Sequence, residues 1–152
     1  MRIEGRFIVV APREQVYARI TDPALMAGCI PGCEAIEVVD AKTYRARILI
    51  EVGPIKARFN LLVEVTREEP PDRVLSVTRG EEGSRASIVS ANNELTLATA
   101  PEGGTEVRYV SEVSVTGRLG KFGLGVMKKK AQALGDKFAE SFRAKVAPET
   151  VP

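Results

Sequence analysis

The sequence of 152 residues contains no histidine and no tryptophan. Histidine is the commonest general base of enzymes and the commonest neutral metal ligand. Its absence excludes Ser-His-Asp and Cys-His catalytic sets, and it excludes zinc sites that combine histidine with cysteine. No apolar run approaches the ~18 residues that a membrane-spanning helix needs. The opening stretch, MRIEGRFIVVAP, lacks the continuous apolar region of a signal peptide, so we expect a cytoplasmic protein.

Cysteine is scarce as well, with only Cys29 and Cys33 on either side of Ile30-Pro31-Gly32. Two thiolates fill only half of a tetrahedral zinc site, and their spacing differs from that of thioredoxin-like pairs. A disulfide needs Cα atoms within about 7 Å, and the reducing cytoplasm disfavours one. We therefore expect no metal site and no cofactor here, and predict that both thiols pack as small hydrophobic groups beside a type II turn.

Charge is balanced in total but uneven along the chain, because the net charge of +2 hides a basic C-terminal segment. From Arg118 to Ala147 there are eight basic and two acidic residues, a net charge of +6 that leaves −4 for the rest. Such a segment is typical of contact with an anionic partner or membrane surface, or simply of a solvated helix face. Nucleic-acid binding is not expected, because basic and aromatic residues are not interleaved.

The length and the ordinary composition, 44% hydrophobic and 28% charged, fit one soluble domain. We assign this domain to residues 1–147 and regard 148–152 as a short tail. Residues 2–11 are predicted to form a strand. Two short helices follow, the first opened by Pro12 and the second capped by Asp22 and ending by Gly28. The buried stripe expected on the first helix consists of Val16, Tyr17 and Ile20.

Six strand-like segments come next, separated by turns that are rich in glycine and proline. The clearest is IKARFNLLVEVT at 55–66, where apolar residues occupy every second position. The others are predicted at 34–40, 43–52, 73–79, 85–99 and about 107–116. Strands joined by short turns form an antiparallel sheet.

A single long helix is predicted at the end, from about Leu119 to Val146. Its apolar stripe consists of Met127, Ala131, Leu134, Phe138 and Phe142. Several glycines near its start weaken the first turns by ~1 kcal/mol each relative to alanine. We therefore expect a loose beginning and a firmly packed second half. Only this helix is long enough to cover the apolar face of the sheet, and the space between them is a natural apolar pocket.

Three separated motifs, in this order, resemble the CoxG family of carbon monoxide dehydrogenase proteins, which belongs to the helix-grip superfamily of START domains, Bet v 1-like allergens and polyketide cyclases. The motifs are DPALMAGCIPGCEAIE at 22–37, VGPIKARF at 52–59, and TGRLGKFGLGVMKKKAQALGDKFAESF at 116–142. The opening EGRFIVVAPREQVYARI at 4–20 also fits. The sequence departs from the family at Phe59-Asn60-Leu61, where Phe-Lys-Gly is usual, and at 125–128. Some members carry a C-terminal segment linked to membrane attachment, which we do not expect in this sequence.

The resemblance implies an α+β helix-grip fold: a seven-stranded curved antiparallel sheet wrapped around one long C-terminal helix, with two short helices after the first strand. It also implies an accessory protein of a molybdenum hydroxylase, such as carbon monoxide dehydrogenase, that serves in its maturation or membrane recruitment. The implied partner is an apolar small molecule, a lipid or a quinone, bound in a cavity between sheet and helix.

Candidate residues for the lining of this cavity come from the turn, from the inward strand faces and from the long helix. We nominate Ile30, Tyr44, Ile48, Phe59, Leu61, Ile88, Tyr109, Val113, Phe122, Val126, Met127 and Leu134. Ile30 is expected either to point inward as part of a lid or to belong to a plain connector. The polar run at 90–94 marks either an inward amide that orients a carbonyl-bearing ligand or a bulge in the strand.

An enzyme is not expected, because no acid and base are paired in the sequence pattern. Two alternatives to non-catalytic binding remain open at this point. One is a small cyclase or hydrolase on the same scaffold, which requires a carboxylate and a tyrosine that converge in the pocket. The other is a protein-binding assembly factor, whose interior is filled.

Overall fold

The computed structural model describes residues 1–146, apart from the side chain of Ser84, and the expected tail at 148–152 lies outside that range. The chain forms seven strands, three α-helices and two short 3₁₀ helices. In order these are β1 (Arg2–Val9), α1 (Arg13–Ile20), α2 (Pro23–Cys29), β2 (Cys33–Asp40), β3 (Thr43–Val52), β4 (Ile55–Glu69), β5 (Arg73–Glu82), η1 (Gly83–Arg85), β6 (Ser87–Thr99), β7 (Thr105–Gly117), η2 (Gly120–Phe122) and α3 (Leu124–Val146).

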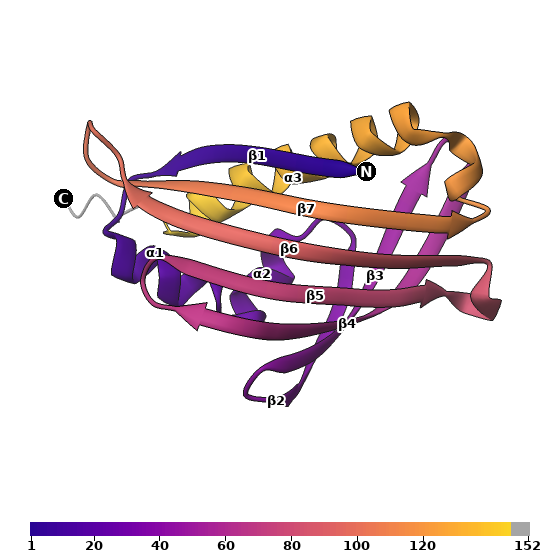
Figure 1. Cartoon of the computed structure of the whole chain (residues 1–152), viewed down its shortest axis with the longest axis horizontal. Helices are drawn as coiled ribbons and strands as arrows, with labels where there is room; N and C mark the ends of the chain where they lie inside the picture. The colour runs from indigo at the N-terminus through magenta and orange to yellow at the C-terminus, as the bar shows by residue number, and fades with distance from the viewer. Residues whose placement is uncertain (147–152) are drawn as a thin grey trace.

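All seven strands form one antiparallel sheet in the order β1-β7-β6-β5-β4-β3-β2. The sheet curves, so that β2 and β3 bend away behind the other strands, and α3 lies behind β1 and β7 (Figure 1). The helices α1 and α2 lie together at the end of the sheet where β1 finishes. The predicted fold, an α+β sheet wrapped around a long C-terminal helix, is confirmed. No helix within residues 1–146 has the length and apolar character to cross a bilayer.

The two short helices form where the sequence predicts them. Residues Val16, Tyr17 and Ile20 are the buried side of α1. The Asp22 carboxylate accepts a hydrogen bond of 3.0 Å from the backbone N–H of Ala24 and so caps α2. This second helix ends at Cys29, one residue later than expected.

The long helix begins at Leu124, so the expectation that it starts near Leu119 is wrong. The residues between form the 3₁₀ turn η2, and Gly123 follows with a φ of 85° that a continuous helix does not allow. The expected difference between its halves is confirmed, because the buried residues Ala139, Phe142 and Val146 all lie in the second half.

Buried hydrophobic residues form two separate clusters rather than one continuous core. The first cluster joins β1, α1, α2 and the second half of α3. It contains Phe7, Val9, Ala11, Val16, Tyr17, Ile20, Cys29, Leu97, Val107, Ala139, Phe142 and Val146. The second lies at the opposite end, near η2, and contains Val52, Ala57, Phe59 and Leu119.

Aromatic rings anchor α3 on β1. The ring of Phe7 lies edge-on to Phe138 and Phe142, at centroid distances of 6.3 and 6.1 Å. The latter two rings stack on each other at 5.8 Å, and the Arg143 guanidinium lies 5.9 Å from the Phe7 ring centre. Such aromatic pairs add about 0.5–1.5 kcal/mol each beyond the burial of their surface. The helix is therefore fixed toward the β1 edge of the sheet.

A buried polar cluster fastens the opposite end, where β7 leads into η2. The hydroxyl of Ser87 donates to Glu82 at 3.0 Å and accepts from the backbone N–H of Leu119 at 3.1 Å. The Arg118 guanidinium also binds the Glu82 carboxylate. The hydrogen bond from Arg118 and, next, that from Ser87 hold the pKa of Glu82 below its ordinary value.

This cluster predicts a loss of stability in acid. A carboxyl group whose pKa is lower in the folded state stabilises the fold above its unfolded pKa, and this contribution is lost as pH falls through the folded pKa. Denaturant titrations between pH 6 and 3 should therefore show a falling free energy of unfolding. The Glu82→Gln variant should start lower at pH 6 and fall less steeply. The exposed Glu64→Gln variant serves as control, and equal slopes for both variants would contradict the assignment.

Candidate functional site

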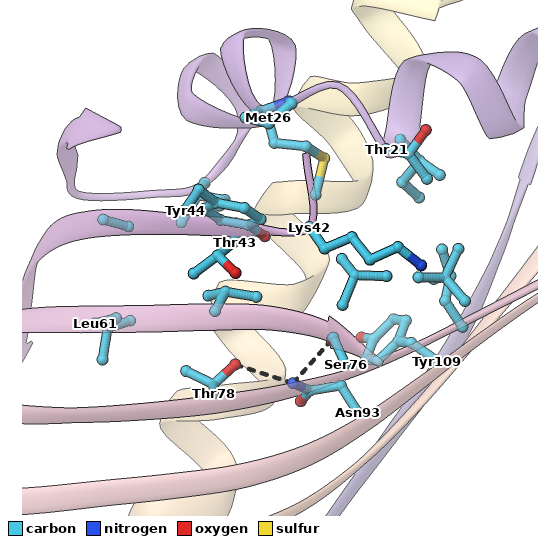
Figure 2. Close-up of a pocket in the computed structure, with 18 of the residues that line it drawn as sticks. Thr21, Met26, Lys42, Thr43, Tyr44, Leu61, Ser76, Thr78, Asn93 and Tyr109 are labelled. Atoms are coloured by element: carbon cyan, nitrogen blue, oxygen red, sulfur yellow. Dashed lines mark hydrogen bonds between the residues drawn. The ribbon is translucent and has the colours of Figure 1, made fainter. Parts of the chain in front are cut away.

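A pocket of about 520 Å³ lies between the two hydrophobic clusters, over the concave face of the sheet. It is bounded on one side by α2 and the β2–β3 turn and on the other by the floor of β4, β5, β6 and β7 (Figure 2). Most of its wall is apolar. The apolar lining includes Phe7, Ile20, Met26, Ile30, Val38, Ala46, Ile48, Leu61, Val63, Val65, Val74, Leu95 and Phe138.

Five of the twelve nominated residues line this pocket: Ile30, Tyr44, Ile48, Leu61 and Tyr109. Ile30 opens the predicted turn, in which the backbone N–H of Cys33 donates to the Ile30 carbonyl at 3.1 Å and Gly32 has a φ of 78°. This geometry confirms a type II turn. That Ile30 acts as a lid over a ligand stays a prediction.

The turn is also fastened to the sheet. The backbone N–H of Leu49 donates to the Gly32 carbonyl at 2.9 Å. A Cβ atom on Gly32 would lie 2.2 Å from the Leu49 carbonyl oxygen, so only glycine fits here. The wall that carries Ile30 is therefore held against β3.

Seven nominated residues lie outside the pocket. Phe59 is buried in the second cluster, and Phe122 and Met127 pack against that cluster, because η2 folds back over the end of β4. Val113 lies on the inward face of β7 but beyond Ser111, the last residue of that strand in the lining. Leu134 is half-buried one helical turn before Phe138, the residue that reaches the pocket.

The remaining two, Ile88 and Val126, are 47% and 48% exposed. Ile88 lies on the outer face because the odd-numbered residues of β6, from Ser87 to Leu97, face inward. Val126 precedes Met127 by one residue, so it lies about 100° away from the apolar stripe of α3.

A polar stripe crosses the floor of the pocket. The strand β6 runs without a bulge, and the amide of Asn93 faces inward, one of the two interpretations that the sequence left open. Its Nδ2 donates to the hydroxyls of Ser76 at 3.3 Å and Thr78 at 3.0 Å (Figure 2). Its Oδ1 accepts from the hydroxyl of Ser111 at 2.8 Å.

Sequence patterns did not single out Ser76, Thr78 and Ser111. Each occupies a position that alternation assigns to the apolar face, and polar residues there have no pattern of their own. The signal lies in strand pairing, because Ser76, Asn93 and Ser111 are direct cross-strand partners. A register assigned to the strands would have found them.

Charged groups gather at the rim. Figure 2 shows Lys42 extended across the pocket from the β2–β3 turn. Asp40 accepts the backbone N–H of Lys42 at 2.9 Å, and Glu94 binds Arg73 at 2.8 Å. Backbone hydrogen bonding from Lys42 lowers the pKa of Asp40. Lys42 is the basic residue of the lining in the described part of the chain.

The ring of Tyr109 separates the pocket from the contact between β1 and α3. Gly5 is its cross-strand partner, and a Cβ atom there would lie 2.3 Å from the Tyr109 hydroxyl oxygen. A Cβ atom on Gly135 of α3 would lie 2.4 Å from the same oxygen. Two glycines thus form a slot for one phenol. Burial raises the pKa of Tyr109 and of Tyr44, so both phenols stay protonated at neutral pH.

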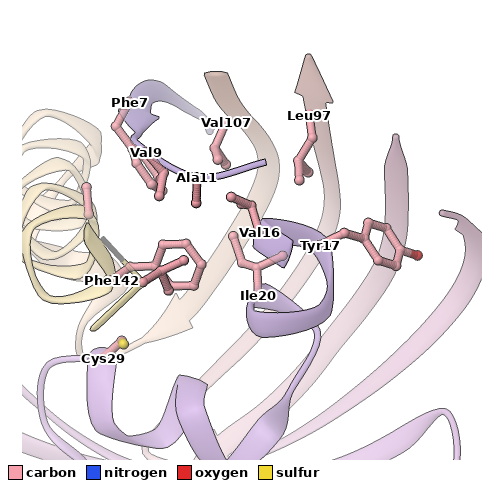
Figure 3. Close-up of a cluster of buried hydrophobic side chains, with 12 residues drawn as sticks. Phe7, Val9, Ala11, Val16, Tyr17, Ile20, Cys29, Leu97, Val107 and Phe142 are labelled. Atoms are coloured by element: carbon pink, nitrogen blue, oxygen red, sulfur yellow. The ribbon is translucent and has the colours of Figure 1, made fainter. Parts of the chain in front are cut away.

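The two cysteines are free thiols. Cys29 is buried in the first cluster, near Phe142 (Figure 3), and Cys33 is half-buried at the start of β2. Burial raises the pKa of both thiols, which makes them less reactive than exposed cysteine. Within residues 1–146, no three cysteine or acidic side chains come together in a way that would hold a metal ion.

Comparisons with known proteins agree with this architecture. The family model of CoxG, described as the G-type subunit of carbon monoxide dehydrogenase, matches residues 5–147. A conserved protein from Geobacillus kaustophilus has a similar structure, with a TM-score of 0.88 and 23% identity over 96% of this chain and 95% of that one. For a START superfamily protein from Mycobacterium smegmatis the TM-score is 0.75 and the identity 11%, over 95% and 96%. These structural similarities show the fold alone. No curated protein matches in sequence.

The slot around Tyr109 predicts an unusual effect of alanine in a helix. A Gly→Ala change inside a helix normally stabilises it by roughly 0.5–1 kcal/mol. Gly135→Ala should instead destabilise the protein by about 1–3 kcal/mol, because the new methyl group collides with the Tyr109 hydroxyl. Urea unfolding measures the change in the free energy of unfolding.

Two further variants make this test specific. Gly135→Ala in a Tyr109→Phe background should recover most of the lost stability, because the colliding oxygen is gone. Gly125→Ala, whose Cβ meets nothing within 4 Å, is the control on the same helix. If Gly135→Ala and Gly125→Ala behave alike, the slot has no energetic role.

Proposed function

The chain belongs to the CoxG family of carbon monoxide dehydrogenase proteins, and from this premise we propose that it binds an apolar small molecule, a lipid or a quinone, without catalysing its conversion. The observation that supports this proposal is the pocket of about 520 Å³, whose wall is mostly apolar. Small-molecule sites typically measure about 300–1,000 Å³ and combine such walls with a few polar groups. An interior of this kind favours binding over the alternative of an assembly factor with a filled core.

The ionisable groups of the pocket favour binding over acid–base chemistry. Asp40 holds the β2–β3 turn through the backbone of Lys42, and Glu94 is paired with Arg73. The phenols of Tyr44 and Tyr109 have raised pKa values, which makes them poor bases near neutral pH. A cyclase or hydrolase needs a proton acceptor that is free and near its substrate, and these groups are committed elsewhere.

The partner that we propose is a molybdenum hydroxylase, with carbon monoxide dehydrogenase as the example that gives the family its name. The proposed role is that of an accessory protein that matures or recruits this enzyme. An affinity-tagged chain expressed in its own host should then retain subunits of a molybdenum enzyme. Recovery of none at native expression levels would count against this partner while leaving ligand binding untouched.

The basic segment suggests where an anionic surface would make contact. At the start of α3, Leu124 is 72% exposed and Val126 is 48% exposed, and both are followed by Lys128 and Lys129. Exposed apolar groups beside lysines are typical of contact with anionic lipid headgroups. We propose this end of α3 as the peripheral contact, on the premise that the bound molecule is exchanged with a membrane.

Filling the pocket should abolish binding. In the Ala46→Phe variant the ring has to occupy the pocket, because Ala46 is a buried part of its wall. Titration with the neutral dye N-phenyl-1-naphthylamine should show affinity weakened by about tenfold or more, equivalent to ~1.4 kcal/mol. Native mass spectrometry of protein purified from its own host should show a bound lipid or quinone for the unaltered chain and none for Ala46→Phe.

The matched control is Ala98→Phe, which adds the same ring at an exposed position of β6. It should bind the dye as the unaltered chain does. If both variants bind equally well, the dye does not occupy this pocket. If the unaltered chain binds no dye and carries no molecule, the carrier function is wrong.

A further inference from the structure

The polar stripe on the pocket floor is isolated within an apolar surface. Cross-strand pairing places Ser76, Asn93 and Ser111 in one row across β5, β6 and β7, with Val65 and Ile3 at its ends. The next row toward α1 contains Val74, Leu95 and Tyr109. On the other side, the row of Thr78 continues into Ala91 and Val113. The stripe is therefore a single polar line at one level of the pocket.

A count of hydrogens shows that the stripe does not satisfy itself. The Asn93 amide has two N–H hydrogens, and Ser76, Thr78 and Ser111 have one hydroxyl hydrogen each. Three hydrogen bonds join these groups, so three hydrogens are used and two remain. The remainder is the same if the amide oxygen and nitrogen are exchanged. As the structure stands, the spare hydrogens belong to Ser76 and Thr78, which both accept from Asn93.

The position of these two hydroxyls is well defined. Both bond the same Nδ2 atom, so they flank one spot on the pocket floor, and both residues line the pocket. Asn93 is held in turn by Ser111 at 2.8 Å, which fixes the orientation of the amide. The spare donors are thus pre-organised, and a ligand meets them without further ordering of side chains.

We propose that Ser76 and Thr78 form a subsite for a neutral oxygen acceptor, so that the bound molecule is an apolar compound that carries a carbonyl group and inserts it against the sheet. This inference rests on the proposed function, because it assumes that the pocket is occupied. A carbonyl oxygen has two lone pairs, and it accepts one hydrogen from each hydroxyl. A plain hydrocarbon would seal both donors away from water unsatisfied, which costs binding free energy.

Charge excludes the opposite orientation for this class of ligand. The stripe consists of neutral groups, and a carboxylate pressed against it would lose its hydration without meeting a cation. The ammonium group of Lys42 is at the rim instead. A fatty acid would therefore leave its carboxylate near Lys42 and turn its hydrocarbon tail toward the stripe, where the two hydroxyls disfavour it. A neutral ketone or quinone matches the floor.

The test compares two probes of the same shape, 2-methyl-1,4-naphthoquinone and 2-methylnaphthalene, by calorimetric titration of the full chain. The unaltered protein should bind the quinone about fivefold or more tightly than the hydrocarbon. Ser76→Ala and Thr78→Val should each weaken quinone binding by about three- to fivefold and leave hydrocarbon binding unchanged. Ser114→Ala and Thr116→Val, exposed on the outer face of β7, should change neither.

A second measurement does not depend on the folding of any variant. The carbonyl stretch of the quinone bound to the unaltered protein should shift to lower frequency than in hexane, as expected for an accepted hydrogen bond. Equal affinity for both probes, or an unshifted carbonyl band, overturns the carbonyl subsite while the carrier function stands. Binding of neither probe overturns both.

Discussion

The structure depends on how α3 is held against β1. The rings of Phe7, Phe138 and Phe142 pack together there, and the slot between Gly5 and Gly135 holds the Tyr109 ring alongside. A helix is about 10–12 Å wide with its side chains, whereas neighbouring strands are spaced about 4.8 Å apart. One helix fixed at the β1 edge therefore cannot cover seven strands. The pocket is the part of the concave face that α3 leaves uncovered.

The two hydrophobic clusters close the ends of that uncovered region. The first, around Phe142 and Val16, joins α1 and α2 to the sheet, and the second, around Leu119 and Phe59, closes the other end through η2. The buried polar cluster at Glu82 secures the second. Stability is thus concentrated at the ends. The middle is left to a wall of aliphatic side chains and one polar stripe, whose amide is satisfied and whose hydroxyls are not.

The fold could be predicted from the sequence because alternation, caps and turns act locally. Asp22 and Pro23 predicted the start of α2, and Pro31 and Gly32 predicted a type II turn that the structure contains. The pocket wall was harder, because it depends on how far α3 is shifted toward β1. Met127 and Phe122 lie on the expected apolar side, yet they pack at the η2 end. The partners of Asn93 required strand register, which no single segment carries.

The turn between the two cysteines shows why side-chain chemistry alone was a poor guide to this site. Its thiols are free and have raised pKa values, so neither is activated. Its backbone does more, because the hydrogen bond from Leu49 to the Gly32 carbonyl ties the end of α2 to β3. Met26 and Ile30 are consequently fixed as a wall of the pocket. Since that wall is held, exchange of a bound molecule has to involve the β2–β3 turn around Lys42, the neighbouring part of the rim.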